Sequence, residues 1–193
     1  MAQSTGSNKI KTAVFISGTG TNLKSLLKFS QSKKSPISIV MVVSNNAKSK
    51  GLKNTNSLKV KKKVYNFKKK FSIEKKIISD LKKEKIKLIC LAGFMVILSR
   101  NFIKKFNGKI LNIHPSLLPK YKGLNTHQRV LENKEKYSGC TVHFVNSKLD
   151  SGKIILQKKI KINKNETPNS LAKKILAHEH KLYPKAILKI FNS

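Results

Sequence analysis

Short apolar runs alternate with amphipathic segments over much of the chain. The runs of strand length predict buried strands at residues 11–17, 37–43, 60–66, 87–92 and 109–113, of which 60–66 is the weakest. Leucine and isoleucine at helical spacing predict helices at 22–29, capped by Thr21, and at 72–84, with a weaker helix ending near residue 57. This alternation favours a mostly parallel sheet covered by helices on both faces.

The pattern changes in the last third of the chain. A helix at 126–132 precedes two adjacent strands at 139–146 and 153–162, which a turn through Asp150-Ser151-Gly152 joins into an antiparallel hairpin. Thr167-Pro168 opens a last helix that reaches about residue 191, with an irregularity expected near Pro184. We therefore expect one α/β domain over residues 10–193, preceded by a disordered extension over residues 1–9.

The composition suits a globular protein in a reducing compartment. Hydrophobic residues make up 39% of the 193 residues, enough for one core but without surplus. No segment approaches the roughly 20 apolar residues of a membrane span, and the N-terminus has no secretory signal. The two cysteines, Cys90 and Cys140, lie in apolar runs and form no CxxC pair. We expect buried free thiols, a cytoplasmic location and no membrane partner.

The net charge of +34 has two explanations. It would attract nucleic acid, and a basic nucleic-acid-binding module stays open as an alternative function. Compositional drift is favoured instead, because the excess is almost entirely lysine spread along the whole chain. Dedicated nucleic-acid binders usually cluster their basic residues and use arginine or aromatic side chains on the bases. We therefore expect no specific nucleic-acid partner.

The segment Asn112-Ile113-His114-Pro115 carries the clearest chemistry in the chain. Two residues apart on a strand, the Asn112 amide and the His114 imidazole leave on the same face. An amide that can hold a carbonyl oxygen, beside a base that titrates near neutrality, suits acyl-type chemistry. The chain has only eight acidic residues, and Asp150 and Glu179 stand out among them as functional candidates because they lie outside the lysine-rich helices.

Two loops that follow predicted strands are further candidates. Residues 17–22 (SGTGTN) end a strand and open a helix, where a phosphate could bind, although a tight turn explains the glycines equally well. Residues 93–98 (GFMVIL) could accept a flat heterocycle or simply pack on the core. The five histidines form no zinc pattern and no serine lies in a GxSxG elbow, so neither a metal nor a nucleophilic triad is expected. His143, alternating on a strand, suits a core or supporting role.

From about residue 11 to 191 the chain resembles the phosphoribosylglycinamide formyltransferases, folate-dependent enzymes of purine synthesis. The resemblance rests on ISGTGTNLKSLL, SNNAKSKGL, LAGFMVILS, ILNIHPSLLPKYKGLNTHQRVLEN, GCTVHFVNSKLDSGKIILQ and HEHKLYP. It implies a Rossmann-like fold and transfer of the formyl group of the cosubstrate 10-formyltetrahydrofolate to the amine of glycinamide ribonucleotide, without a metal. It also implies small-molecule partners only, and leaves monomer or homodimer open.

Residue by residue, the resemblance implies Asn112, His114 and Asp150 as the catalytic set, with Asp150 raising the pKa of His114. The substrate would bind at Gly20, Thr21, Asn22, Leu23 and Glu179. Folate would contact Met95, Val96, Ile97 and Leu98, together with Asn112, Asp150 and, in place of an arginine common in the family, Lys70. A methionyl-tRNA formyltransferase stays an alternative, although we expect no room for the C-terminal RNA-binding domain that it would need.

Overall fold

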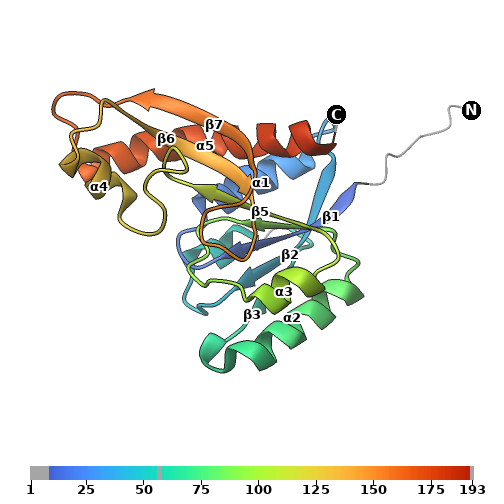
Figure 1. The fold of residues 1–193 in the computed structure, drawn as a ribbon. Helices are drawn as coiled ribbons and strands as arrows, with labels where there is room; N and C mark the ends of the chain where they lie inside the picture. The colour runs from blue at the N-terminus through green and yellow to red at the C-terminus, as the bar shows by residue number, and fades with distance from the viewer. Residues whose placement is uncertain (1–8, 56–57, 192–193) are drawn as a thin grey trace, which may run out of the picture.

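The computed structural model describes residues 9–55 and 58–191, and a seven-stranded sheet forms the centre of this part of the chain (Figure 1). The strand order is β3-β2-β1-β4-β5-β6-β7. Strands β1 to β5 run parallel, whereas β6 is antiparallel to β5 and to β7. Their bounds are β1 Ile10–Ile16, β2 Ile37–Ser44, β3 Lys61–Val64, β4 Leu88–Leu91, β5 Lys109–His114, β6 Tyr137–Phe144 and β7 Ile154–Lys161.

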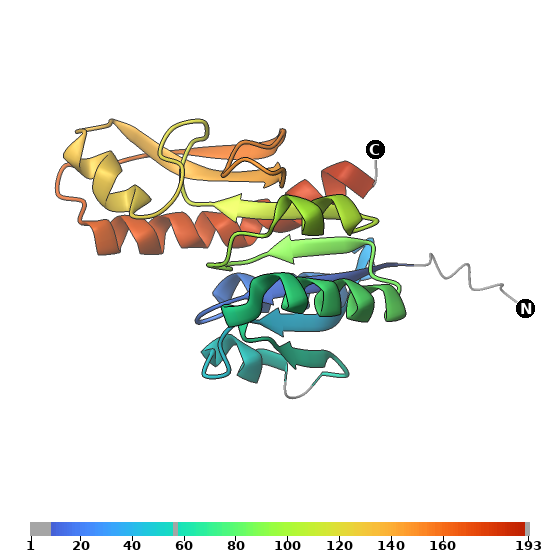
Figure 2. The ribbon, with the colours of Figure 1, turned by 60° about the horizontal axis from the view of Figure 1, so that its bottom comes forward.

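Helices cover both faces of this sheet, as the strand-helix alternation predicts (Figures 1 and 2). One core packs leucines of α1 and α5 against one face, and a second core packs α2 and α3 against the other. The helices are α1 Thr21–Gln31, α2 Lys70–Lys83, α3 Arg100–Lys105, α4 Thr126–Glu132 and α5 Pro168–Phe191, with 3₁₀ turns η1 Lys50–Thr55 and η2 Phe67–Lys69. No helix in the described ranges is both long and apolar enough to cross a bilayer.

Several local predictions need correction. Thr21 is the first residue of α1 and does not cap it; the N-cap is Gly20, which has a φ of 72° and offers no side chain. Glycine is required there because a Cβ would lie 2.5 Å from the Cα of Gly51. The weak helix predicted before residue 57 is the 3₁₀ turn η1, and residues 56–57 lie outside the described chain. The extension expected at residues 1–9 lies outside it too, apart from Lys9.

Helix α3 was not predicted, since six residues are too few to display a helical period. Its start is nevertheless chemically defined: the Ser99 hydroxyl accepts a hydrogen bond from the Phe102 N–H at 3.0 Å. The Ser99 N–H and hydroxyl in turn both donate to the buried Glu74 carboxylate on α2. Helix α5 continues through Pro184 without a break in the assigned helix.

Candidate active site

The two candidate loops meet where the strand order reverses, between β1 and β4. Open α/β sheets bind ligands at this position, outside the carboxyl ends of the strands. The Ser17 N–H donates to the Gly93 carbonyl oxygen at 3.1 Å, and the Met95 N–H donates to the Ser17 hydroxyl oxygen at 2.8 Å. The fold therefore joins the glycine loop after β1 to the apolar loop after β4.

A cavity of about 590 Å³ opens over the glycine loop. Gly20, Thr21 and Asn22 line it at the start of α1. The first helical N–H to find a backbone acceptor is that of Lys24, which bonds to the Gly20 carbonyl at 2.9 Å, so the preceding N–H groups lack an intrahelical partner. Leu23 contributes to this set only through its main chain, because its side chain is fully buried in the core.

Glu179, on α5, borders the same cavity together with Asn22. The Asn22 amide donates to a Glu179 carboxylate oxygen at 2.7 Å. Burial raises the pKa of Glu179, and the Asn22 hydrogen bond offsets only part of that rise. The Asn22 side-chain oxygen is itself buried and has no hydrogen-bond partner in the described chain, so it remains available to a donor on a ligand.

A second cavity, of about 550 Å³, adjoins the first, and the two share Asn22, Gly93, Met95, Pro115, His127 and Glu179. Residues 93–98 form one wall, so Met95, Val96, Ile97 and Leu98 all lie where the sequence prediction puts them. Met95 and Ile97 are about two-thirds exposed, at 62% and 64%, and give this wall an apolar surface. Lys70 begins α2 and lines neither cavity.

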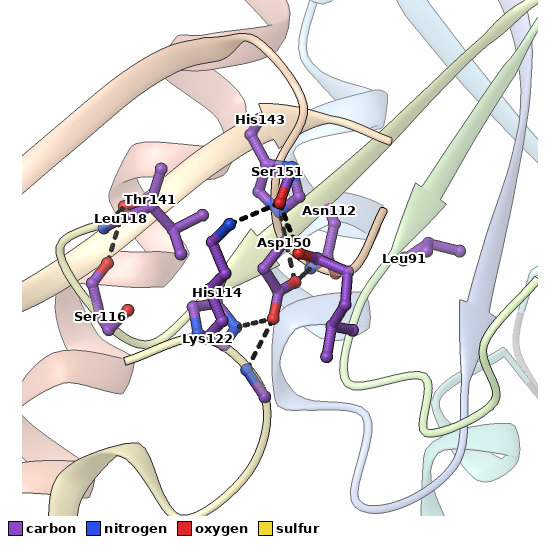
Figure 3. A network of polar contacts seen from close by, with 12 residues as sticks. Leu91, Asn112, His114, Ser116, Leu118, Lys122, Thr141, His143, Asp150 and Ser151 are labelled. Atoms are coloured by element: carbon purple, nitrogen blue, oxygen red, sulfur yellow. Dashed lines mark hydrogen bonds and ion pairs between the residues drawn. The ribbon is translucent and has the colours of Figure 1, made fainter. Parts of the chain in front are cut away.

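Asn112, His114 and Asp150 come together along the second cavity (Figure 3). Asn112 and His114 share one face of β5, and Asp150 reaches them from the connection between β6 and β7. Asp150 Oδ2 lies 3.4 Å from His114 Nδ1, and Asp150 Oδ1 lies 3.4 Å from Asn112 Nδ2. At these lengths the groups are close but not tightly bonded to one another.

The main chain of the loop after β5 holds two of these groups. His114 Nε2 lies 2.8 Å from the Tyr121 carbonyl oxygen, which can only accept, so Nε2 carries the proton. The Gly123 N–H donates to Asp150 Oδ2 at 2.9 Å. In neutral His114 the Nδ1 lone pair therefore faces the carboxylate.

Asp150 does raise the pKa of His114, as predicted, but the net shift of that pKa is downward. Burial lowers the pKa of the imidazole, and this effect outweighs the opposite influence of the Tyr121 carbonyl and Asp150. Burial also acts to raise the pKa of Asp150, but His143, the Gly123 N–H and His114 together hold it below its usual value. Because both pKa values are lowered, the ionised form of Asp150 and the neutral form of His114 are favoured at neutral pH.

His143, which the sequence suggested only as a core or supporting group, belongs to this cluster. Its register on β6 places it opposite Asn112. His143 Nδ1 donates to the Phe144 carbonyl oxygen at 2.8 Å, and its Nε2 lies 3.2 Å from the Asn112 amide nitrogen and 3.7 Å from Asp150 Oδ1. His143 thereby orients the amide. The only signal in the sequence is the alternation of the strand, which gives the face but not the partner.

Residues 10–187 match the family described as "Formyl transferase". The chain belongs to the formyl transferase family. It is 43% identical to the trifunctional purine biosynthetic protein adenosine-3 of Gallus gallus over 93% of this chain, but spans only 18% of that relative's length. It is 41% identical to the phosphoribosylglycinamide formyltransferase of Haemophilus influenzae, covering 92% of this chain and 85% of the relative.

Solved structures of the family share the fold of this formyl transferase. The phosphoribosylglycinamide formyltransferase of Brucella melitensis is 40% identical, with a TM-score of 0.89 over 95% of this chain and 96% of that one. That of Anaplasma phagocytophilum is 39% identical, with a TM-score of 0.87 over 93% and 85% of the two chains. These relatives confirm the predicted Rossmann-like fold and favour a formyl transferase over a nucleic-acid-binding module.

Two residues that sequence reasoning did not select also border the site of this formyl transferase. His127, near the start of α4, lines both cavities, and its Nδ1 is buried without a hydrogen-bond partner in the described chain. Lys173, on α5, brings a positive charge to the rim of the glycine-loop cavity. Lys173 stands in none of the segments that carry the family resemblance, whereas His127 lies within one of them, ILNIHPSLLPKYKGLNTHQRVLEN, but was not selected as a site residue. Among the described residues, no cluster of three or more histidines, cysteines and acids could hold a metal ion.

Proposed function

We propose that this formyl transferase moves the formyl group of 10-formyltetrahydrofolate to the primary amine of glycinamide ribonucleotide, a step of de novo purine biosynthesis. One observation carries the proposal above the others. Asn112, His114 and Asp150 converge on a cavity that adjoins the glycine-loop cavity at the start of α1. Two substrates bound in adjoining cavities would meet beside an amide, a base and a carboxylate.

The glycine-loop cavity suits the ribonucleotide. Its phosphate would accept from the free N–H groups at the first turn of α1, with the helix dipole and Lys173 supplying positive potential. Glu179 is placed to accept from the ribose hydroxyls. The unpartnered Asn22 side-chain oxygen would then accept from a donor on the substrate instead of staying unsatisfied.

The second cavity suits the folate. Residues 93–98 offer apolar walls and main-chain hydrogen-bonding groups to the edge of a flat pterin ring. Leu124 and Leu149 on the opposite side are 72% and 51% exposed, which leaves apolar surface for the rest of the cosubstrate. Lys70 lies outside this cavity, at the start of α2, so it would contact the folate only through the polar tail of the cosubstrate, where that tail extends beyond the cavity.

The reaction follows from the arrangement of these groups. The amine of the ribonucleotide attacks the formyl carbon, giving a tetrahedral intermediate with an oxyanion. The Asn112 amide nitrogen lies 3.2 Å from His143 Nε2 and donates to Asp150 Oδ1 over a longer 3.4 Å; the hydrogen in this longer bond would turn to the oxyanion. His114 takes the proton of the attacking amine at Nδ1, and Asp150 stabilises the resulting imidazolium. The carbon–N10 bond then breaks and N10 receives that proton.

The test is a comparison of formyl acceptors. Purified protein is given 10-formyltetrahydrofolate with glycinamide ribonucleotide, with initiator tRNA, or with water alone, and tetrahydrofolate release and acceptor mass are followed. We expect formylation of the ribonucleotide alone, and its loss in a folded His114→Ala variant. Formylated tRNA would establish the alternative transferase, and folate deformylation without any acceptor would establish a hydrolase. The dephosphorylated riboside, as a control, should be a much poorer acceptor.

We also propose that the protein acts in the cytoplasm as a monomer or homodimer on small-molecule substrates. The buried free thiols of Cys90 and Cys140 support a reducing compartment. Sedimentation of the purified protein, with and without both substrates, would determine the oligomeric state.

A further inference from the structure

The loop between β5 and α4 contributes main-chain groups to the site at two successive points. The Tyr121 carbonyl fixes the Nε2–H tautomer of His114, at 2.8 Å, and the Gly123 N–H binds Asp150, at 2.9 Å. A shift of this loop by even one ångström would lengthen both bonds beyond useful hydrogen-bond geometry. The position of the loop therefore determines the position of the base and of its carboxylate.

This loop adopts a conformation that needs support. Tyr121, Gly123 and Asn125 all have positive φ angles, of 56°, 78° and 55°. The left-handed region is unfavourable for a residue with a bulky side chain such as Tyr121. Such a backbone persists only where the surrounding structure restrains it.

Arg129 supplies that support from α4. Its Nη1 donates to the Lys122 carbonyl oxygen at 2.7 Å and lies 3.4 Å from the Leu124 carbonyl oxygen. Its guanidinium carbon lies 5.4 Å from the centre of the Tyr121 ring, within cation–π distance. One side chain thus contacts three residues of the loop. It forms no hydrogen bond or ion pair with Asn112, His114 or Asp150, although its positive charge helps to lower the pKa of His114.

Two weaker restraints act at the ends of the same loop. The Tyr121 hydroxyl donates to Glu135 at 2.9 Å, and the Lys122 ammonium donates to the Ser151 hydroxyl at 2.5 Å (Figure 3). Both join one side chain to another, whereas Arg129 binds the main chain itself. Arginine also suits the task better than lysine, because its planar head can stack on a ring while its N–H groups bond carbonyls. Arg129 is one of only two arginines in the chain.

We propose that Arg129 is a positioning residue for formyl transfer. It holds residues 121–124 so that the Tyr121 carbonyl and the Gly123 N–H keep His114 and Asp150 in their reactive arrangement. This inference rests on the proposed function for its kinetic consequence, but its structural consequence, the tautomer of His114, can be measured independently.

The kinetic test replaces Arg129 by methionine and by lysine. We expect Arg129→Met to lower kcat on the order of tenfold to a hundredfold with little change in the KM for the ribonucleotide, and Arg129→Lys to restore part of the loss. Arg100→Met, the same change at the other arginine, is the matched control and should leave kcat unchanged. In a His114→Ala background Arg129→Met should cost nothing further, since its effect passes through His114.

The independent test is the ¹⁵N spectrum of the His114 ring. In the unaltered protein we expect the neutral imidazole as the Nε2–H tautomer alone, and in Arg129→Met a mixture of both tautomers. A pure Nε2–H tautomer in Arg129→Met, or losses of kcat that add fully to those of His114→Ala, would overturn the proposal. If Arg129→Met fails to fold, the same readouts on Arg129→Lys decide. Absence of formyl transfer by the unaltered protein would refute the proposed function, and the tautomer result would still decide the role of Arg129.

Discussion

Replacing Asp150 by asparagine removes one negative charge from the centre of the site while keeping the shape of the side chain. The asparagine oxygen can still accept from the Gly123 N–H, which binds Asp150 at 2.9 Å, so we expect the variant to fold. What it loses is the carboxylate that faces His114 Nδ1 at 3.4 Å. The loss matters most when the imidazole becomes charged during the reaction.

The distance sets the size of the effect. Two unit charges 3.4 Å apart interact by about 5 kcal/mol at an effective dielectric constant of about 20. The asparagine dipole and water recover part of this, which leaves a net loss of about 3–4 kcal/mol in the transition state. Since each 1.4 kcal/mol is about tenfold in rate, kcat should fall on the order of 100- to 1,000-fold. KM should change little, because the charge pair forms only as the proton moves.

Two measurements check this reasoning. Steady-state kinetics of Asp150→Asn should give the loss in kcat, and an NMR titration should show the pKa of His114 falling further, because one of the influences that raise it has been removed. Circular dichroism and thermal melting serve as the control for folding. Near-normal turnover, or an unchanged His114 titration, would refute the role assigned to Asp150.

Two further substitutions test the ribonucleotide site. Glu179→Gln should raise the KM for the ribonucleotide about five- to tenfold, since a charged acceptor becomes neutral, without affecting the KM for the folate. Burial raises the pKa of Glu179, so above about pH 4.3 the folded protein binds more protons than the unfolded chain and loses stability as the pH rises. Glu179→Gln cannot ionise and should therefore melt at a higher temperature than the unaltered protein at pH 7, and at the same temperature at pH 4. The reverse order of melting temperatures would be contrary evidence. Gly20→Ala should lower the melting temperature by at least about 5 °C. The φ of 72° alone costs an alanine about 1–2 kcal/mol of folding free energy, and its Cβ would also clash with Gly51. An unchanged melting curve would contradict this reasoning.

Much of the fold was accessible from the sequence because the buried strands are nearly continuous apolar runs. Strands β1, β2, β4 and β5 were predicted to within about two residues at either end. Strand β3 (KKKV) was weakly predicted because its four residues are exposed at the edge of the sheet, where apolar residues are not required. Helix α3 was missed for a different reason, since its start depends on a cap and not on a period.

The site could be predicted only in pieces. The two-residue period of a strand puts Asn112 and His114 on one face, but nothing local brings Asp150 to them across 36 positions of the sequence. In the structure, the antiparallel strands β6 and β7 bring Asp150 to this position. The prediction that Asp150 acts together with Asn112 and His114 came from the family resemblance. His143 was undervalued for the same reason, because its pairing with Asn112 is a matter of strand register.

The net direction of the His114 pKa exposes a limit of pairwise reasoning. A carboxylate beside an imidazole raises its pKa, and that inference from the sequence is correct as far as it goes. Burial acts in the opposite direction and prevails here. How deeply a side chain lies depends on every element packed around it, so the balance between the two effects is a property of the folded molecule.

The loop before α4 lies in a segment that carries the family resemblance, but none of its residues was selected as a site residue, because it acts through main-chain groups. Tyr121 and Gly123 contact His114 and Asp150 through a carbonyl and an N–H, groups that nearly every residue possesses. The identity of such residues carries little information about their role. The information lies instead in whatever fixes the backbone, and in this loop that is a side chain four residues beyond it, Arg129. A reactive arrangement built on main-chain contacts therefore depends on residues that never touch the substrate.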